Sequence, residues 1–259
     1  YPFEATAELP GGNFERMREM SLAQAKLGRL KVLEDTAAAL TIETAHGLVG
    51  LRRGDRCEAA GMVGAVDEHW LFVMKNAVVQ QMTHTMPDVA DTLRWSDGNN
   101  AGSLPPNFAF VRVTDVAPLG TDFLRVTLRG EDLSKHQDDS IHFRLVIPPV
   151  GHAPQWPTVA ANGSVVWPDG DAAPHRPVYT TRRIDHTTDT ITMDVFIHEG
   201  GRVTEWAQAQ QSNPRKQQIV GVLGPSGGGI LKADRVLMAS DETGFPAAAR
   251  LLEHLPANA

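Results

Sequence analysis

The chain has 259 residues, 42% hydrophobic and 21% charged, so it can form one large or two ordinary globular domains. The formal net charge of −7 argues against a nucleic-acid partner, because nucleic-acid binding depends on many basic residues that neutralise phosphates. The single cysteine, Cys57, excludes an internal disulfide and a four-cysteine iron–sulfur cluster, and no apolar run is long enough to span a membrane.

The N-terminal segment lacks the basic-then-apolar pattern of a signal peptide, and it lacks an initiator methionine. We therefore expect a reducing, cytoplasmic setting and a natural chain that begins further upstream. The first elements form a predicted α+β domain over residues 1–105. It has a helix capped by Asn13 with Phe14, Met17, Leu27 and Leu30 on its apolar face, and a second helix stopped by Pro87. The helices are predicted over 13–33 and 76–86, and the strands within 39–44, 47–53, 56–65 and 69–75.

A turn-rich stretch, residues 96–107, separates this domain from a run of short alternating segments. Regularly spaced short strands of this kind predict a closed antiparallel β-barrel over residues 106–232, with one helix over 201–211. Its strands are predicted within 108–118, 122–130, 141–149, 163–168, 177–185, 190–198 and 218–225. A strand over 234–240 and a helix over 247–255 then predict the start of a parallel α/β nucleotide-binding domain, residues 233–259.

The stretch RPVYTTRRID, residues 176–185, concentrates three arginines around a Tyr-Thr pair. Arginine guanidinium groups fit phosphate oxygens in two-point fashion, and tyrosine offers a flat ring for stacking. In an extended strand Tyr179 and Thr181 share one face, and Thr180 and Arg182 share the other. The pattern is typical of a site for a flat ring system joined to a pyrophosphate. A solvent-facing basic strand is the alternative.

Two further segments favour nucleotide binding. HEGGRVTEWAQ, residues 198–208, places two glycines before a helix, whose free backbone N–H groups can bind phosphate. In SDETGFPAAARLLEHL, residues 240–255, three polar residues precede a helix that has Pro246 in its first turn. An ordinary turn and an ordinary capped helix are the alternative readings of these two segments.

Together these segments resemble the siderophore-interacting proteins, flavin-dependent ferric-siderophore reductases related to the ferredoxin–NADP reductase superfamily. The resemblance runs from about Phe108 to the end of the chain. It rests on IHFRLVIPP, the Tyr-Thr-x-Arg of YTTR, the His-x-x-Gly-x-x-x-x-Trp-Ala of HEGGRVTEWA, LGP and, above all, SDETGFPAAARLLEHLP.

The resemblance implies an FAD bound to the barrel and reduced by NADH or NADPH. Tyr179 would lie against the isoalloxazine, Thr180 would bond its edge, and Arg182 would neutralise the pyrophosphate. The backbone of Gly201 to Thr204 would bind the other side of the pyrophosphate, with His198 near the adenine. The cofactor-binding residues predicted in this way are Arg176, Tyr179, Thr180, Thr181, Arg182, His198, Gly200, Gly201, Arg202, Val203, Thr204, Trp206, Asp241, Glu242 and Thr243.

The substrate implied is a ferric siderophore, attracted by a local basic patch that includes Arg183. The reaction implied is single-electron reduction of Fe(III), with release of the more weakly bound Fe(II). The alternatives are a general flavin reductase or ferredoxin-reductase-like electron donor, and a non-redox siderophore- or haem-binding protein. The histidines are scattered without the spacing of a metal site, so no metal centre is predicted, and His84 between two methionines leaves a haem role open for the first domain.

Two departures from the family pattern stand out. The family has Arg-x-Tyr-Thr, whereas Pro177 occupies that arginine's place here and Arg176 lies one residue earlier, on the opposite face of a regular strand unless a bulge intervenes. The family's nucleotide-binding half also continues past the last helix, so we expect an incomplete C-terminal domain. The siderophore, the choice of NADH or NADPH, the role of the first domain and the oligomeric state stay open.

Overall fold

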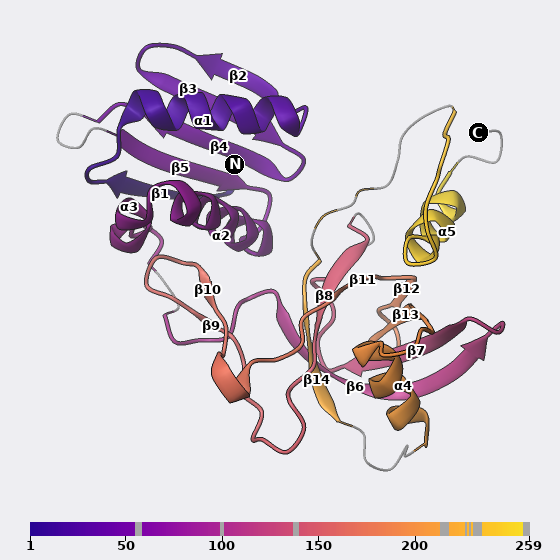
Figure 1. The fold of residues 1–259 in the computed structure, drawn as a ribbon. Helices are drawn as coiled ribbons and strands as arrows, with labels where there is room; N and C mark the ends of the chain where they lie inside the picture. The colour runs from indigo at the N-terminus through magenta and orange to yellow at the C-terminus, as the bar shows by residue number, and fades with distance from the viewer. Residues whose placement is uncertain are drawn as a thin grey trace. The chain divides into compact units, whose positions relative to one another are not determined.

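The structure, a computed structural model, describes residues 1–54, 59–98, 101–136, 140–212, 218–225, 227, 229 and 235–255. The chain divides into two compact units (Figure 1). Unit 1 comprises Tyr1–Pro106 and Trp156–Pro168, and unit 2 comprises Asn107–Gln155 and Asp169–Ala259. No helix among the described residues is long and apolar enough to cross a membrane.

Unit 1 is a five-stranded antiparallel sheet with helices packed against one face. The strand order is β1-β5-β4-β3-β2. The alternation of small and aliphatic residues directs one side of each strand towards the helices, which is why these short segments form a half-buried sheet. The elements are β1 (Phe3–Leu9), α1 (Phe14–Leu27), β2 (Lys31–Asp35), β3 (Ala39–Thr44), β4 (Gly47–Arg52), β5 (Ala59–Ala65), α2 (Glu68–Thr85) and α3 (Pro87–Thr92).

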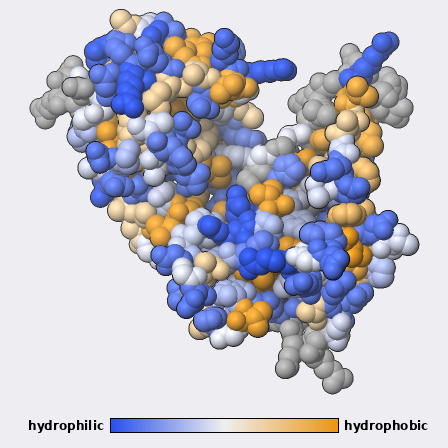
Figure 2. Space-filling model, in the orientation of Figure 1, coloured by the Kyte–Doolittle hydropathy of each residue, from blue (hydrophilic) through white to orange (hydrophobic). Residues whose placement is uncertain are grey.

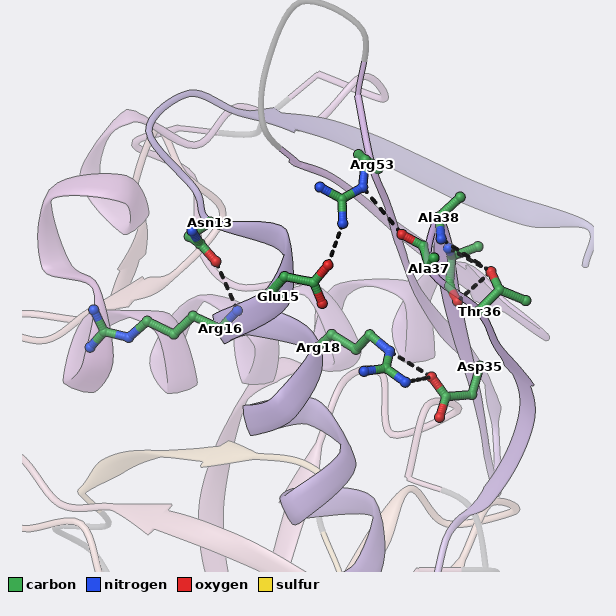
Figure 3. Close-up of polar contacts among 10 residues, drawn as sticks. Asn13, Glu15, Arg16, Arg18, Asp35, Thr36, Ala37, Ala38 and Arg53 are labelled. Carbon is green, nitrogen blue, oxygen red and sulfur yellow. Dashed lines mark hydrogen bonds and ion pairs between the residues drawn. The ribbon is translucent and has the colours of Figure 1, made fainter.

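Helix α1 is fixed at its N-terminal half. Asn13 accepts a hydrogen bond from the Arg16 N–H at 2.9 Å, which confirms its predicted role as the cap. Arg18 donates to Asp35 at 2.6 Å, and Arg53 pairs with Glu15 (Figure 3). The prediction that this helix continues to residue 33 is wrong, because the chain from Lys31 instead pairs with β3. Leu27 and Leu30, predicted on its apolar face, are exposed.

The second correction concerns residues 69–75, predicted as a strand and found inside α2. Asp67 starts this helix by accepting a hydrogen bond from the Trp70 N–H at 2.7 Å. A short apolar run reads alike for a buried strand and a buried helix, so periodicity could not separate them. The predicted helix over 76–86 is confirmed as the rest of α2, and Pro87 begins α3.

A hairpin from the second half of the chain belongs to unit 1. Its strands β9 (Thr158–Val159) and β10 (Val165–Val166) form a separate two-stranded sheet. Asn162 between them donates to the Ala90 carbonyl at 3.0 Å, and the Trp95 indole donates to the Asn162 carbonyl at 3.0 Å. The prediction that residues 163–168 form a barrel strand is therefore wrong.

Unit 2 is built on a seven-stranded antiparallel sheet of order β11-β8-β14-β6-β7-β13-β12. Buried aliphatic and aromatic side chains from these strands and from α4 make its core. The elements are β6 (Phe108–Leu119), β7 (Phe123–Gly130), β8 (His142–Val146), a 3-10 turn (Gly170–Ala172), β11 (Val178–Thr180), β12 (Arg183–Asp185), β13 (Thr190–Phe196), α4 (Arg202–Ser212), β14 (Ile219–Leu223) and α5 (Phe245–Glu253).

The two edge strands of this sheet, β11 and β12, are consecutive in the chain. The two residues between them bond to opposite ends of the sheet. The Thr181 N–H donates to the Ile141 carbonyl, and the Arg182 N–H donates to the Thr192 carbonyl, both at 2.8 Å. The junction thus links both edges, although closure of the sheet into a barrel stays a prediction.

The segment before α5 differs from its prediction. The predicted strand over 234–240 is absent from the part that the structure describes, residues 235–240, and Leu237 is 98% exposed. A parallel strand needs neighbours for its backbone and its apolar side chains, and no described strand pairs with this segment. The predicted helix is confirmed as α5, with Pro246 in its first turn.

Candidate functional site

The strand pair β8–β11 carries the predicted Tyr-Thr motif. Tyr179 pairs with Phe143 and Thr180 with His142, and the bridge between His175 and Ile147 keeps the same register. No bulge therefore interrupts the segment from His175 to Thr180. In this register Arg176 lies on the face of Thr180 rather than that of Tyr179, as the sequence pattern indicates.

Tyr179 and Thr180 are uncharged neighbours at the end of β11, with their side chains on opposite faces of the strand. Tyr179 is half-buried against the core of unit 2, and this burial raises the pKa of its phenol to about 12. The phenol is consequently protonated at neutral pH and able to donate a hydrogen bond. Thr180 is buried, with its hydroxyl 3.5 Å from Nδ1 of His142. Burial lowers the pKa of His142, so that ring is neutral at neutral pH.

Arg182, the predicted phosphate ligand, is engaged by two carboxylates. Its Nη2 donates to Oε1 of Glu253 on α5 at 2.6 Å, and its Nε lies 3.3 Å from Oδ2 of Asp194 on β13. Arg125 on β7 donates two hydrogen bonds to the same Asp194, at 2.7 and 2.8 Å. We call Arg125, Asp194, Arg182 and Glu253 the neutralised network, because two arginines meet two carboxylates in it.

Helix α5 meets the strand junction at a second point. Arg250, only 1% exposed, donates through Nη1 to the Thr181 carbonyl. Thr181 itself is buried, so its carbonyl is satisfied by this contact. Upstream of α5, Asp241 accepts bonds from the Thr243 hydroxyl at 2.7 Å and the Gly244 N–H at 3.0 Å, and the first of these chiefly lowers its pKa.

A second group of basic residues lies along the start of β11 and α4. The guanidinium of Arg144 donates to the Arg176 carbonyl at 2.7 Å, and burial together with the Arg144 charge lowers the pKa of Arg176. Burial and the nearby Arg202 charge likewise lower the pKa of His175. Within the described residues neither Arg144 nor Arg202 is ion-paired with a carboxylate. We call Arg144, Arg202 and His175 the uncompensated group.

The glycine loop forms a tight turn into α4. Gly200 has φ +71°, and a Cβ on Gly201 would lie 2.7 Å from the His198 ring, so this turn excludes larger residues. The Thr204 hydroxyl donates to the Phe196 carbonyl at 3.2 Å, which fixes the first turn of the helix. The first N–H groups of an α-helix have no acceptor within the helix, so this end can bind an anion.

The other predicted residues divide into surface and core. His198, Arg183, Asp241, Glu242 and Thr243 are exposed and accessible to a ligand. Val203 and Trp206 are instead buried in the core of unit 2.

The Trp206 indole donates to Gln218 at 3.2 Å, so this motif residue supports α4 from within. Sequence reasoning missed Arg144, although IHFRLVIPP shows a basic residue within a strand that pairs with the Tyr-Thr strand.

These residues fit a ligand with a pyrophosphate and a flat ring. Arginines that repel one another gain most from an anion between them, and a helix start adds further N–H donors. The half-buried, uncharged Tyr179 ring on the same strand pair suits an uncharged ring system. The strand pair and the loop thus carry the kinds of group that the predicted flavin-nucleotide site requires.

Comparisons with known proteins point the same way. Residues 110–229 match the family "Siderophore-interacting FAD-binding domain". The chain is 34% identical over 158 residues to the NADPH-dependent ferric-chelate reductase of Escherichia coli (strain K12), with 57% of each chain covered. It is 30% identical over 146 residues to the ferric vibriobactin reductase ViuB of Vibrio cholerae serotype O1, with 53% of this chain and 51% of that relative covered. The chain spans about half the length of these curated relatives.

Solved structures with partial similarity include a siderophore utilization protein from T. fusca. It is 27% identical with a TM-score of 0.45, and the match covers 59% of this chain and 57% of that chain. The siderophore-interacting protein SipS from Aeromonas hydrophila is 21% identical with a TM-score of 0.46, covering 59% of this chain and 56% of that chain.

Proposed function

We propose that this chain, whose residues 110–229 match the siderophore-interacting FAD-binding domain family, acts in an NAD(P)H-dependent enzyme that reduces the iron of ferric siderophores. The observation that carries the proposal is the position of the uncompensated group. Arg144 and Arg202 both lie within the matched segment, and Arg144 is on β8, which pairs with the Tyr-Thr strand. The two relatives named as ferric-chelate and ferric vibriobactin reductases support the same activity, which we place in the cytoplasm.

For the pyrophosphate of FAD we propose Arg144, Arg176 and the start of α4 from Gly201 to Thr204. These groups offer charge that no carboxylate within the described residues takes from Arg144 or Arg202. The family pattern assigns Arg182 to the phosphate. We propose that Arg182 instead has a structural role. Its bonds to Glu253 and Asp194 hold the junction between the two sheet edges.

For the isoalloxazine we propose the Tyr179 ring, with the adjacent Thr180 at the edge of the flavin, and we expect the sheet beside them to close into a barrel through the Thr181–Arg182 junction. The Tyr179 phenol, protonated at neutral pH, would face the ring without adding charge. A bound FAD would supply the chemistry that accepts a hydride from NADH or NADPH and delivers its two electrons singly, one to each of two Fe(III) ions. The protein's part is to orient the ring and to limit access of water.

Two exposed sites complete the proposal. Arg183 on β12 would attract an anionic ferric chelate towards the flavin. Asp241, Glu242 and Thr243, before α5, would adjoin the nicotinamide. Fe(II) binds hard-oxygen chelators more weakly than Fe(III) does, so reduction would release the iron.

The test is anaerobic. The protein is reconstituted with FAD, freed of unbound flavin, reduced with dithionite and mixed with a ferric catecholate chelate. We expect flavin reoxidation together with two Fe(II) per flavin, trapped by ferrozine. A protein that retains no FAD, or a reduced flavin that stays reduced with the chelate present, would contradict the proposal. A colourless protein that binds the ferric chelate would support the non-redox binder instead.

A further inference from the structure

Unit 1 contains a cavity of about 320 Å³ between its helices and its sheet. This volume lies within the range of small-molecule sites, about 300–1,000 Å³. Both α1 and α2 contribute to its walls, and strands β3, β4 and β5 form its floor. Gln24, Leu30 and Gln81 line the cavity and are exposed, so the cavity opens to the surface. Figure 2 shows apolar side chains gathered on the outside of this unit as well.

The floor is hollow because the strands carry small residues on the face that the helices cover. Gly61 lies in the middle of β5 on this face, opposite Ala7 on β1 and Leu51 on β4. A Cβ on Gly61 would meet only Leu9 at 3.6 Å and the Ala7 carbonyl at 4.0 Å, both ordinary contacts. Glycine inside a strand weakens it, and its presence often marks close approach by a ligand.

The walls are apolar and soft. Among the described residues that line the cavity there is no aspartate, glutamate, lysine, arginine or histidine. Five of the chain's eight methionines line it from α1, α2 and the residue after α2, and thioether side chains adapt to ligands of varied shape. These methionines are Met17, Met20, Met74, Met82 and Met86.

The polar groups of the lining are uncharged amides and hydroxyls. Thr44 and Thr85 already bond within the protein, to the Gly47 and Gln81 carbonyls. Gln24 and Gln81 are exposed and Ser21 is half-buried, so these polar side chains lie towards the surface. A charged group inside the cavity would lose its hydration without gaining a charged partner, which is unfavourable. An uncharged polar end at the mouth could instead form hydrogen bonds with the polar side chains there.

We propose that unit 1 is a binding module for a neutral aliphatic molecule, a hydrocarbon chain ending in an uncharged polar group. The chain lies over Gly61 among the methionines, and the polar end reaches the mouth near Gln24 and Gln81. His84, considered from the sequence for haem, is exposed and bonds its own helix at the Gln80 carbonyl, outside this cavity.

The test uses the uncharged dye N-phenyl-1-naphthylamine, displaced by 1-decanol. We expect saturable binding of the dye at one site per chain and full displacement by decanol. Gly61→Leu places a side chain in the cavity and should weaken dye binding at least tenfold. Ala60→Leu adds the same side chain to the neighbouring position on the opposite face of β5 and should leave binding unchanged.

A second variant guards against misfolding. Ser21→Phe fills the cavity from α1 instead of the sheet and should weaken binding in the same way. Each variant's thermal unfolding is compared with that of wild type, and binding is compared only among variants that unfold cooperatively. A folded Gly61→Leu or Ser21→Phe protein that binds the dye like wild type would overturn the proposal, as would a wild type that binds none.

Discussion

Unit 2 contains two groups of arginines, which differ in whether carboxylates balance their charges. In the neutralised network, Arg125 and Arg182 meet Asp194 and Glu253 at distances of 2.6 to 3.3 Å. In the uncompensated group, neither Arg144 nor Arg202 pairs with a carboxylate among the described residues, and burial together with the Arg202 charge lowers the pKa of His175. The charges of the neutralised network are balanced within the protein, whereas those of the uncompensated group remain available to an anionic ligand.

The difference teaches how to choose between arginines in one motif. Arg176 and Arg182 lie six positions apart in the same stretch, so a motif cannot rank them. The structure shows that Glu253 and Asp194 neutralise Arg182, whereas Arg144, which the motif omits, has no carboxylate partner among the described residues. Two results would contradict this comparison: a neutralised network that is not needed for stability, or an uncompensated group that is not needed for FAD binding.

The largest expected effect concerns the neutralised network. Asp194→Asn keeps the shape of the side chain but leaves Arg125 and Arg182 without their shared anion. Asp194 is 6% exposed, and breaking a buried ion pair from one side costs about 3–5 kcal/mol. We expect the free energy of unfolding in urea to fall by about 3 kcal/mol. Asp115→Asn, an exposed aspartate on β6, is the control, and an equal effect of the two would break the comparison.

The next effect concerns the anchor of α5. Arg250→Met removes the donor to the Thr181 carbonyl and leaves a buried acceptor unsatisfied, which costs about 1–3 kcal/mol. We expect amide hydrogen exchange in α5 and at the strand junction to quicken together. Leu252→Ala, exposed on the same helix, should leave the junction unchanged. Faster exchange confined to α5 would show that the contact does not couple the helix to β11 and β12.

A smaller effect depends on pH. The hydrogen bond from Arg182 is the main cause that lowers the pKa of Glu253. A lowered folded-state pKa stabilises the protein above the ordinary glutamate range, and this contribution is lost as pH falls through the folded value. Glu253 is 58% exposed, so we expect less than about 1 kcal/mol. Wild type should exceed Glu253→Gln in unfolding temperature at pH 7 and match it near pH 3, and a constant gap would contradict this assignment.

The smallest expected effect is a change in the pKa of His175, a member of the uncompensated group. The Arg202 charge lowers the pKa of His175 in addition to burial. Removing that charge in Arg202→Gln should therefore raise the pKa of His175, measured by NMR titration of its ring proton. Arg183→Gln is the control on another strand. An unchanged His175 titration in Arg202→Gln would remove Arg202 from the group.

Local patterns predicted much of the fold. Asn13 as a cap, most strands, α4 and α5 with Pro246 follow from capping chemistry and alternation. The failures had non-local causes. Residues 69–75 carry an apolar run that a buried helix and a buried strand share, and residues 163–168 join unit 1 through Asn162 contacts with residues far away in sequence.

The candidate site was predictable in outline. The Tyr-Thr strand and the glycine loop are visible in the sequence, and the register of Arg176 follows from strand alternation. The neutralisation of Arg182 was not predictable, because Asp194 and Glu253 come from β13 and α5. Arg144 was missed for the same reason, since only the pairing of β8 with β11 brings it to Arg176.

The central claim is that the uncompensated group, and not the neutralised network, binds the pyrophosphate of FAD. Its most direct test is calorimetric titration of apoprotein with FAD in Arg144→Gln and Arg182→Gln, at low and at moderate salt. A charge-assisted contact is worth about 1.5–3 kcal/mol, so Arg144→Gln should weaken FAD binding about ten- to hundredfold and flatten its salt dependence. Arg182→Gln should change FAD affinity less than threefold while lowering stability. A larger loss of affinity in Arg182→Gln than in Arg144→Gln would contradict the account.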